Sequence, residues 1–242
     1  MKPTSIIIGG SKGVGKVIAA GLVDAGHTVA IVSRSRPPED LSARHYECDL
    51  AREESCLELV STLQAANYRI NHLVFAQRFR GVEDVWEGEL QTSLSATRFL
   101  IEALAKQFAD SGERSITIFG SSYGSRIGDS QPVSYHIAKG ALEHLVRFYA
   151  VRLGKAGIRV NAVAPATYIK EESQERLLTD KALMDLYREI VPLGRLATAR
   201  EVAEVVWFLC SPAASYVTGN IIKLDGAMGH LCPESLALSL RR

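Results

Sequence analysis

The chain has 242 residues, of which 47% are hydrophobic and 23% are charged. This composition is typical of a globular protein and excludes intrinsic disorder, which requires low hydrophobicity and a high net charge. Lys and Arg total 28 against 27 acidic residues, and the resulting net charge of +1 argues against a nucleic-acid partner. No apolar run approaches the roughly 20 residues of a membrane span, and the richest run, Val202 to Cys210, is interrupted by Glu204.

The cysteines and histidines indicate neither a disulfide framework nor a metal site. The four cysteines are scattered without a CxxC motif, and the six histidines lack the spacing of metal ligands. The N-terminal residues lead directly into an apolar stretch and glycines, without the long apolar region of a signal peptide. We therefore expect a cytoplasmic protein without a membrane segment and without a bound metal.

Short apolar runs alternate with longer helical periodicities along the whole chain. The predicted strands are Ser5–Ile8, Thr28–Val32, His45–Glu47, His72–Phe75, Ser115–Phe119, Ile158–Val163 and Ile221–Leu224. The predicted helices are Gly13–Ala25, Arg52–Gln64, Leu90–Asp110, Ser134–Gly154, Glu172–Glu189 and Arg200–Cys210. Continuously apolar strands that alternate with helices predict a parallel sheet covered on both faces. With no linker or repeat in between, residues 1–242 are predicted to form one doubly wound α/β domain.

A glycine-rich turn follows the first predicted strand and precedes the first predicted helix. Gly9, Gly13 and Gly15 permit a tight turn, a close approach of the backbone to a pyrophosphate, and close packing of helix on strand. The helix N-terminus offers free N–H groups to phosphate oxygens. This arrangement predicts a Rossmann-type dinucleotide site.

The residue types at the end of the second predicted strand favour NADP(H) over NAD(H). An NAD site usually carries an acidic residue there for the ribose 2′-hydroxyl, whereas this chain has Ser33 followed by Arg34. Lys12 in the glycine turn supplies a second cation, and two cations attract a 2′-phosphate. The alternative is that Arg34 and Lys12 are solvated surface charges.

A second constellation lies in the predicted helix Ser134–Gly154. Tyr135 and Lys139 are four residues apart and share one helix face, so the ammonium can stabilise the phenolate and lower the pKa of the tyrosine. Tyr135 would then act as an acid or base near neutrality. Ser121 and Ser122 stand just upstream, after a predicted strand, where open α/β sheets place their ligands.

Taken together, these residues resemble the short-chain dehydrogenase/reductases, and in particular the branch similar to 3-oxoacyl-carrier-protein reductase. The resemblance covers nearly the whole chain. Further motifs that carry it are Asp49-Leu50, Ile158-Arg159-Val160-Asn161 before Pro165, Pro192-Leu193-Gly194-Arg195, and Val217-Thr218-Gly219 before Asp225-Gly226.

The resemblance implies an oxidoreductase that transfers a hydride between nicotinamide and a carbonyl or alcohol group of a small or acyl-type substrate. It implies Tyr135 as the acid or base, Lys139 as the residue that lowers its pKa and holds the nicotinamide ribose, and Ser121 as a hydrogen-bond partner of the substrate. In the family the serine usually stands three residues before a glycine, and this spacing favours Ser121. The family's spacing between serine and tyrosine instead favours Ser122. The residues expected to contact NADP(H) are Gly9, Ser11, Lys12, Gly13, Val14, Gly15, Ser33, Arg34, Asp49, Leu50, Ala76, Tyr135, Lys139 and Pro165.

The chain also departs from the family pattern near the expected site. Residues Phe75 to Arg78 stand where the family has Asn-Asn-Ala-Gly, and Ser93 stands where an asparagine usually supports the lysine through water. Whether Ser93 replaces that asparagine functionally is left open by the sequence. These departures keep one alternative function in view, a non-catalytic NADP(H)-binding protein that has lost turnover.

Three further features carry expectations. Arg78, Arg80 and Arg126 are expected either to form an anion clamp at the pocket mouth or to be solvated loop cations, with Glu83 as a partner of Arg78. The segment 166–193 is expected to be a substrate lid, although its apolar face could instead contact another subunit. The resemblance implies a homotetramer, or a homodimer, built on the helices Leu90–Asp110 and Ser134–Gly154 and the last strand.

Overall fold

The computed structural model describes residues 2–82, 85–171 and 174–240, apart from the side chains of Arg176 and Ser239. Within these residues the main sheet is parallel and has seven strands in the order β3-β2-β1-β4-β5-β6-β9. The strands are β1 (Thr4–Ile8), β2 (Thr28–Ser33), β3 (Arg44–Glu47), β4 (His72–Phe75), β5 (Ser115–Phe119), β6 (Arg159–Pro165) and β9 (Ile221–Leu224). A small separate pair is formed by β7 (Tyr168–Ile169) and β8 (Ala197–Thr198). The predicted doubly wound α/β fold is confirmed.

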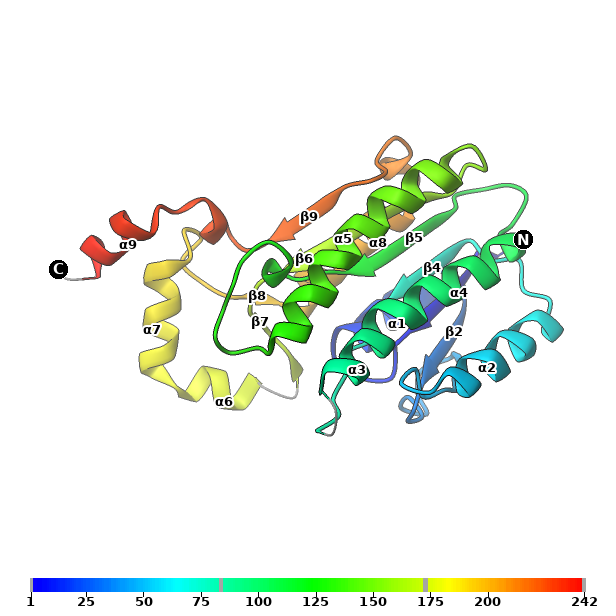
Figure 1. Ribbon diagram of the computed structural model, residues 1–242, viewed down its shortest axis with the longest axis horizontal. Helices are drawn as coiled ribbons and strands as arrows, with labels where there is room; N and C mark the ends of the chain where they lie inside the picture. Colours follow the sequence, from blue (N-terminus) through cyan, green and yellow to red (C-terminus); the bar gives the residue numbers. More distant parts are fainter. Residues whose placement is uncertain (1, 83–84, 172–173, 241–242) are drawn as a thin grey trace.

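Helices cover both faces of the sheet (Figure 1). The helices are α1 (Gly13–Asp24), α2 (Glu53–Ala65), α3 (Val85–Glu89), α4 (Ala96–Leu104), α5 (Val133–Gly154), α6 (Gln174–Thr179), α7 (Lys181–Ile190), α8 (Ala199–Cys210) and α9 (Pro233–Ser239). Short 3-10 turns are η2 (Ala105–Gln107), η3 (Ser122–Gly124), η5 (Pro212–Ala214) and η6 (Met228–His230). Apolar side chains of α2, α4 and α5 form the core on one face, and those of α1 and α8 form the core on the other.

The central strands are buried on both faces, which explains their continuous apolar sequence. Every residue of β1, β4, β5 and β6 is buried. Close packing of α1 on α8 depends on Gly21, because a Cβ there would lie 2.0 Å from the Trp207 ring. Trp207 Nε1 donates to the Ile18 carbonyl at 3.1 Å, which links the two helices.

Two predicted helices differ from the observed ones. The helix predicted for Leu90–Asp110 is preceded by α3 and begins with a π-helical segment, η1 (Leu90–Ser95), before α4. The helix predicted for Glu172–Glu189 is divided into α6 and α7 by Asp180, whose Oδ1 caps α7 by accepting from Leu183 N at 3.0 Å. The start of that predicted helix, Glu172 and Ser173, lies outside the described residues.

Helices α6 and α7 lie at one end of the molecule, beyond the carboxyl ends of β6 and β9, and the N-terminus lies at the opposite end (Figure 1). No helix in the described parts of the chain has the length and apolar character needed to cross a membrane. Over the same residues, His, Cys, Asp and Glu side chains form no cluster that could hold a metal ion.

Candidate active site

A cleft of about 850 Å³ opens at the carboxyl edge of the sheet. It runs past the ends of β1 and β4, where the strand order reverses direction, which is the position at which open α/β sheets bind ligands. Each residue predicted from the sequence to contact cofactor or substrate lines this cleft. They are Gly9, Ser11, Lys12, Gly13, Val14, Gly15, Ser33, Arg34, Asp49, Leu50, Ala76, Ser121, Tyr135, Lys139 and Pro165.

The glycine turn between β1 and α1 has the close backbone contacts that its sequence implies. Gly9 has φ +85°, and a Cβ there would lie 2.6 Å from Gln77 N. A Cβ on Gly15 would lie 2.2 Å from the carbonyl oxygen of Gly9, so the start of α1 packs directly on the turn. Any side chain at either position would displace the backbone that forms the cleft floor.

The first turn of α1 is left open toward the cleft. Lys12 is the N-cap residue, its side chain makes no capping hydrogen bond, and the first turn contains no acidic residue. Uncapped N–H groups and the positive end of the helix dipole favour a bound anion. Together with the contacts of Gly9 and Gly15, this cradle fits the pyrophosphate of a dinucleotide.

The end of β2 carries cations and hydroxyls. Lys12 and Arg34 are exposed side chains that line the cleft, and they stand on the same wall because the hydroxyls of their neighbours Ser11 and Ser35 lie 3.3 Å apart. Ser33 Oγ donates to the Ser35 carbonyl at 2.8 Å and lies 3.1 Å from His45 Nε2. The role of His45 in holding Ser33 was not predicted from the sequence, because it follows from the pairing of β2 with β3.

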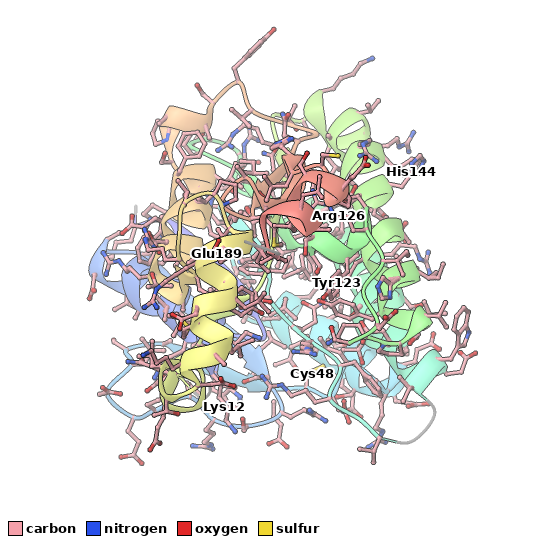
Figure 2. All side chains as sticks on the ribbon, turned by 90° about the vertical axis from the view of Figure 1, so that its left-hand side faces the viewer. Lys12, Cys48, Tyr123, Arg126, His144 and Glu189 are labelled. Atoms are coloured by element: carbon pink, nitrogen blue, oxygen red, sulfur yellow. The ribbon has the colours of Figure 1, made fainter. Side chains whose placement is uncertain are left out.

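The next wall of the cleft is formed by the turn after β3. Asp49 and Leu50 line it, as predicted, together with the buried Cys48, which was not predicted. The turn is fixed by hydrogen bonds, in which Asp49 N donates to Ser55 Oγ at 3.0 Å and Ala51 N donates to Asp49 Oδ1 at 3.2 Å. In Figure 2, which faces the carboxyl edge of the sheet, Cys48 and Lys12 are labelled on the lower part of this face and Tyr123 above them.

Ser121, Tyr135 and Lys139 meet at the other end of the cleft. Ser121 follows β5, its Oγ accepts a hydrogen bond from Tyr123 N at 3.2 Å, and its side chain acts on the phenol of Tyr135 and lowers the pKa of that phenol. Tyr135 and Lys139 lie one turn apart on α5, with Lys139 Nζ 5.5 Å from the centroid of the tyrosine ring. Lys139 Nζ donates to the Phe119 carbonyl at 2.8 Å. Ser122 also lines the cleft, and the serine whose side chain acts on the pKa of Tyr135 is Ser121.

The electrostatics of this group differ in one respect from the expectation. Burial raises the pKa of Tyr135 above its usual range, although the hydrogen bond from Ser121 and the charge of Arg78 lower it. Burial also lowers the pKa of Lys139 to about 8. The expected lowering of the Tyr135 pKa is therefore not found, since desolvation of the phenol dominates and Lys139 directs its ammonium to the Phe119 carbonyl.

The three arginines of the expected anion clamp do not gather at one place. Arg78 lines the cleft, with its guanidinium carbon 5.8 Å from the centroid of the Tyr135 ring and Nη2 3.3 Å from Gln131 Oε1. Arg80 also lines the cleft. Arg126, labelled above Tyr123 in Figure 2, instead pairs with Asp225 at 3.7 Å. The anion clamp as predicted is therefore wrong for Arg126, because a buried carboxylate holds that side chain. Glu83 lies outside the described residues.

Ser93 does not line the cleft. It is 1% exposed, and its Oγ donates to Glu89 Oε1 at 2.5 Å inside the helical layer behind Tyr135 and Lys139. Glu89 is itself buried and was not singled out from the sequence. It ends the short, mostly polar helix α3, whose sequence gave no signal of burial.

The segment after β6 borders the cleft opposite α5. Leu177, Leu183 and Tyr187 from α6 and α7 line it. At the base of this segment, Glu171 pairs with Lys16 of α1 at 2.5 Å. Other apolar residues of the segment do not face the cleft, since Leu178 and Leu186 are exposed to solvent.

This fold and this cleft define a dinucleotide-binding α/β protein, and comparison with known proteins identifies its family. The family model described as enoyl-(acyl carrier protein) reductase matches residues 9–228. The chain belongs to the short-chain dehydrogenase/reductase family, whose members are oxidoreductases that bind a nicotinamide cofactor.

The chain is similar to relatives along nearly its whole length. It is 30% identical to a tropinone reductase homolog from Arabidopsis thaliana over 245 residues, covering 93% of each chain. It is also 30% identical to the 3-oxoacyl-[acyl-carrier-protein] reductase of Aquifex aeolicus over 246 residues, covering 93% of this chain and 96% of the relative. A solved 4-hydroxyisoleucine dehydrogenase complexed with NADH superposes with a TM-score of 0.85 at 20% identity, covering 96% and 100% of the two chains. At that identity the likeness supports the fold.

Proposed function

We propose that the protein is an NADP(H)-dependent oxidoreductase that transfers a hydride between nicotinamide and a carbonyl or alcohol group of a small or acyl-type substrate. The observation that carries the proposal is the meeting of Ser121, Tyr135 and Lys139 at one end of a cleft whose other end is the glycine cradle. A proton donor and a dinucleotide site in one cleft suit carbonyl reduction, which consumes one hydride and one proton.

The roles of the chain's own residues follow from their positions. When bound, the nicotinamide supplies the hydride in reduction and accepts it in the reverse reaction. Ser121 and Tyr135 hold the substrate oxygen by hydrogen bonds, and Tyr135 donates the proton that turns the developing alkoxide into an alcohol. The raised pKa of Tyr135 keeps the phenol protonated at neutral pH, which suits a proton donor.

NADP(H) is proposed over NAD(H) because of charge. The wall at the end of β2 carries Lys12 and Arg34, and a serine stands at its last position. A 2′-phosphate there would meet two cations, which attract it. Gly9, Ser11, Gly13, Val14, Gly15, Asp49, Leu50, Ala76 and Pro165 are proposed to contact the rest of the cofactor.

The substrate end of the cleft favours a carbonyl compound with a negatively charged group. Arg78 lies over the ring of Tyr135, and its charge acts on both Tyr135 and Lys139. A carboxylate on the substrate would pair with the guanidinium while the carbonyl oxygen meets Tyr135. The segment 166–193 is proposed as the lid over this end, since Leu177, Leu183 and Tyr187 supply an apolar cover.

We further propose a homo-oligomer, a tetramer or a dimer, located in the cytoplasm. Val133, Ile137, Phe148 and Val151 are exposed on one face of α5, and such a stripe favours contact with a second copy. The four cysteines of the chain are unpaired, which suits a reducing compartment. Light scattering coupled to size-exclusion chromatography gives the mass, and a monomer at all concentrations would contradict the oligomer.

The function is tested by following NADPH oxidation over a panel of ketones, keto acids, quinones and acyl thioesters. The wild type should reduce at least one class, and Tyr135→Phe should keep its NADPH affinity while its turnover falls at least about 100-fold. Ser122→Ala serves as the matched control beside Ser121→Ala, and only the latter should lose turnover. Tight NADPH binding without turnover across the panel would instead support a non-catalytic binding protein.

A further inference from the structure

Glu89 is a buried carboxylate at the end of α3, in the helical layer behind the candidate active site. It is 4% exposed, and its Oε1 accepts the hydrogen bond from Ser93 Oγ at 2.5 Å. Transfer of a carboxylate out of water costs several kcal/mol unless neighbouring groups compensate for it. A carboxylate buried in this way is therefore expected to lie near a cation, whose charged form it stabilises.

A buried cation, Lys139, lies on the neighbouring helix α5. Both α3 and η1 pack against α5, and Lys139 Nζ is held by the Phe119 carbonyl at 2.8 Å. Burial lowers the pKa of Lys139 to about 8, and the charge of Glu89 raises it again. The negative charge of Glu89 thus favours the protonated form of Lys139.

The backbone around Ser93 is fixed by a second set of hydrogen bonds. Thr97 Oγ1 donates to the Ser93 carbonyl at 2.7 Å, and Gln77 Nε2 donates to Thr97 Oγ1 at 2.8 Å. Gln77 lines the cleft, so this chain of bonds links the cleft wall to the turn that holds Glu89. Ser93 belongs to the π-helical segment η1, and π-helical insertions occur frequently at functional sites.

We propose that Glu89, held in place by Ser93, is a positioning residue that keeps Lys139 protonated and so sets the pH range over which Tyr135 transfers its proton. The proposal rests on the proposed function. In this chain a serine-held carboxylate takes the place at which the family pattern has an asparagine amide.

The charges around this group determine the sign of the effect. Arg78, from the loop after β4, opposes Glu89 by lowering the pKa of both Lys139 and Tyr135. On α5, Glu143 is paired with Arg147 at 3.5 Å. Glu89 raises the pKa of both Lys139 and Tyr135, so its removal should move both titrations to lower pH. Tyr123 acts in the same direction as Glu89 on Tyr135.

The test compares Glu89→Gln with Glu87→Gln, an exposed acid on the same helix. The glutamine keeps an oxygen for Ser93 and removes the charge. The alkaline limb of the pH profile of kcat for reduction, along which Lys139 and Tyr135 lose their protons, should shift to lower pH by about one unit in Glu89→Gln and stay in place in Glu87→Gln. Ser93→Ala, which frees the carboxylate, should shift the profile in the same direction by a smaller amount.

A second readout does not depend on turnover. NMR of 13C-labelled lysine side chains, with Lys139 assigned from Lys139→Arg, follows the titration of Lys139 directly. Its midpoint should fall in Glu89→Gln, in a protein whose thermal melting confirms that it is folded. An unchanged midpoint, or an equal fall in Glu87→Gln, would overturn the proposal. A fall in the midpoint in a protein without any turnover would retain the Glu89–Lys139 coupling and contradict the proposed function.

Discussion

The charge at the end of β2 leads to a prediction about cofactor choice. Lys12 and Arg34 lie on one wall of the cleft, and both side chains are exposed. An exposed ion pair contributes up to about 1 kcal/mol, because water and salt screen it. Two such contacts correspond to a roughly 30-fold lower dissociation constant for NADPH than for NADH.

Arg34→Asp should remove this preference. The change deletes one attraction of about 1 kcal/mol and adds a repulsion of similar size between carboxylate and 2′-phosphate. The ratio of the two dissociation constants should therefore fall about 30-fold, to near one. Arg36→Asp is the matched control, since Arg36 is exposed on the same loop and does not line the cleft.

The assay is fluorescence titration of each protein with NADPH and NADH at two ionic strengths. The NADPH preference of the wild type should weaken at higher salt, as expected for exposed charges, and Arg36→Asp should behave like the wild type. Equal dissociation constants for the two cofactors in the wild type would refute the reasoning. An equal loss in Arg34→Asp and Arg36→Asp would show that general surface charge, and not a phosphate contact, sets the preference.

Two further predictions concern the substrate end of the cleft and the opposite edge of the sheet. Arg78→Met should raise KM about tenfold for a keto acid and change KM for a neutral ketone little. The reason is that the guanidinium pairs with the substrate carboxylate. Equal changes for both substrates would count against this pairing. Burial lowers the pKa of His72 to about 3, with smaller contributions from His27 and Arg159, so the unfolded chain takes up a proton near pH 6.5 before the folded protein does. Because of this histidine, the free energy of unfolding should therefore fall by about 1.4 kcal/mol for each pH unit below about 6.5. His72→Asn should reduce that slope in denaturant titrations at pH 7 and pH 5, and an unchanged slope would contradict the assignment.

Much of the fold could be predicted from the sequence because the strands are buried on both faces. Continuous apolar runs such as Ser5–Ile8 and His72–Phe75 mark strands that helices cover, and the observed strands agree with the predicted ones within about two residues. The glycine turn was also predictable, since its conformation depends on local backbone geometry rather than on distant contacts.

The interrupted helix could not be predicted from periodicity. Buried residues Leu100, Ile101 and Leu104 keep the apolar spacing of a regular helix through α4. The π-helical segment before it instead accompanies contacts with other parts of the chain, such as the bond from Gln77 Nε2 to the Thr92 carbonyl at 3.3 Å. Such tertiary contacts leave no signal in a local pattern.

Within the candidate site, sequence spacing located the side chains better than it predicted their charges. Ser121, Tyr135 and Lys139 were predicted to meet, and they line one cleft. The raised pKa of Tyr135 depends on desolvation, which follows from three-dimensional packing. The pairing of Arg126 with Asp225 was likewise invisible, because 99 positions separate the two residues in the chain.

The most direct test of the central claim is the fate of the hydride. The protein is supplied with NADPH that carries deuterium on the transferring face of C4, together with a carbonyl compound that it reduces, and the product is examined by mass spectrometry. The wild type should place one deuterium on the carbinol carbon of the product, and Tyr135→Phe should form this product at least about 100-fold more slowly. Product without deuterium, or NADPH binding without any labelled product, would contradict the assignment of the protein as a hydride-transferring oxidoreductase.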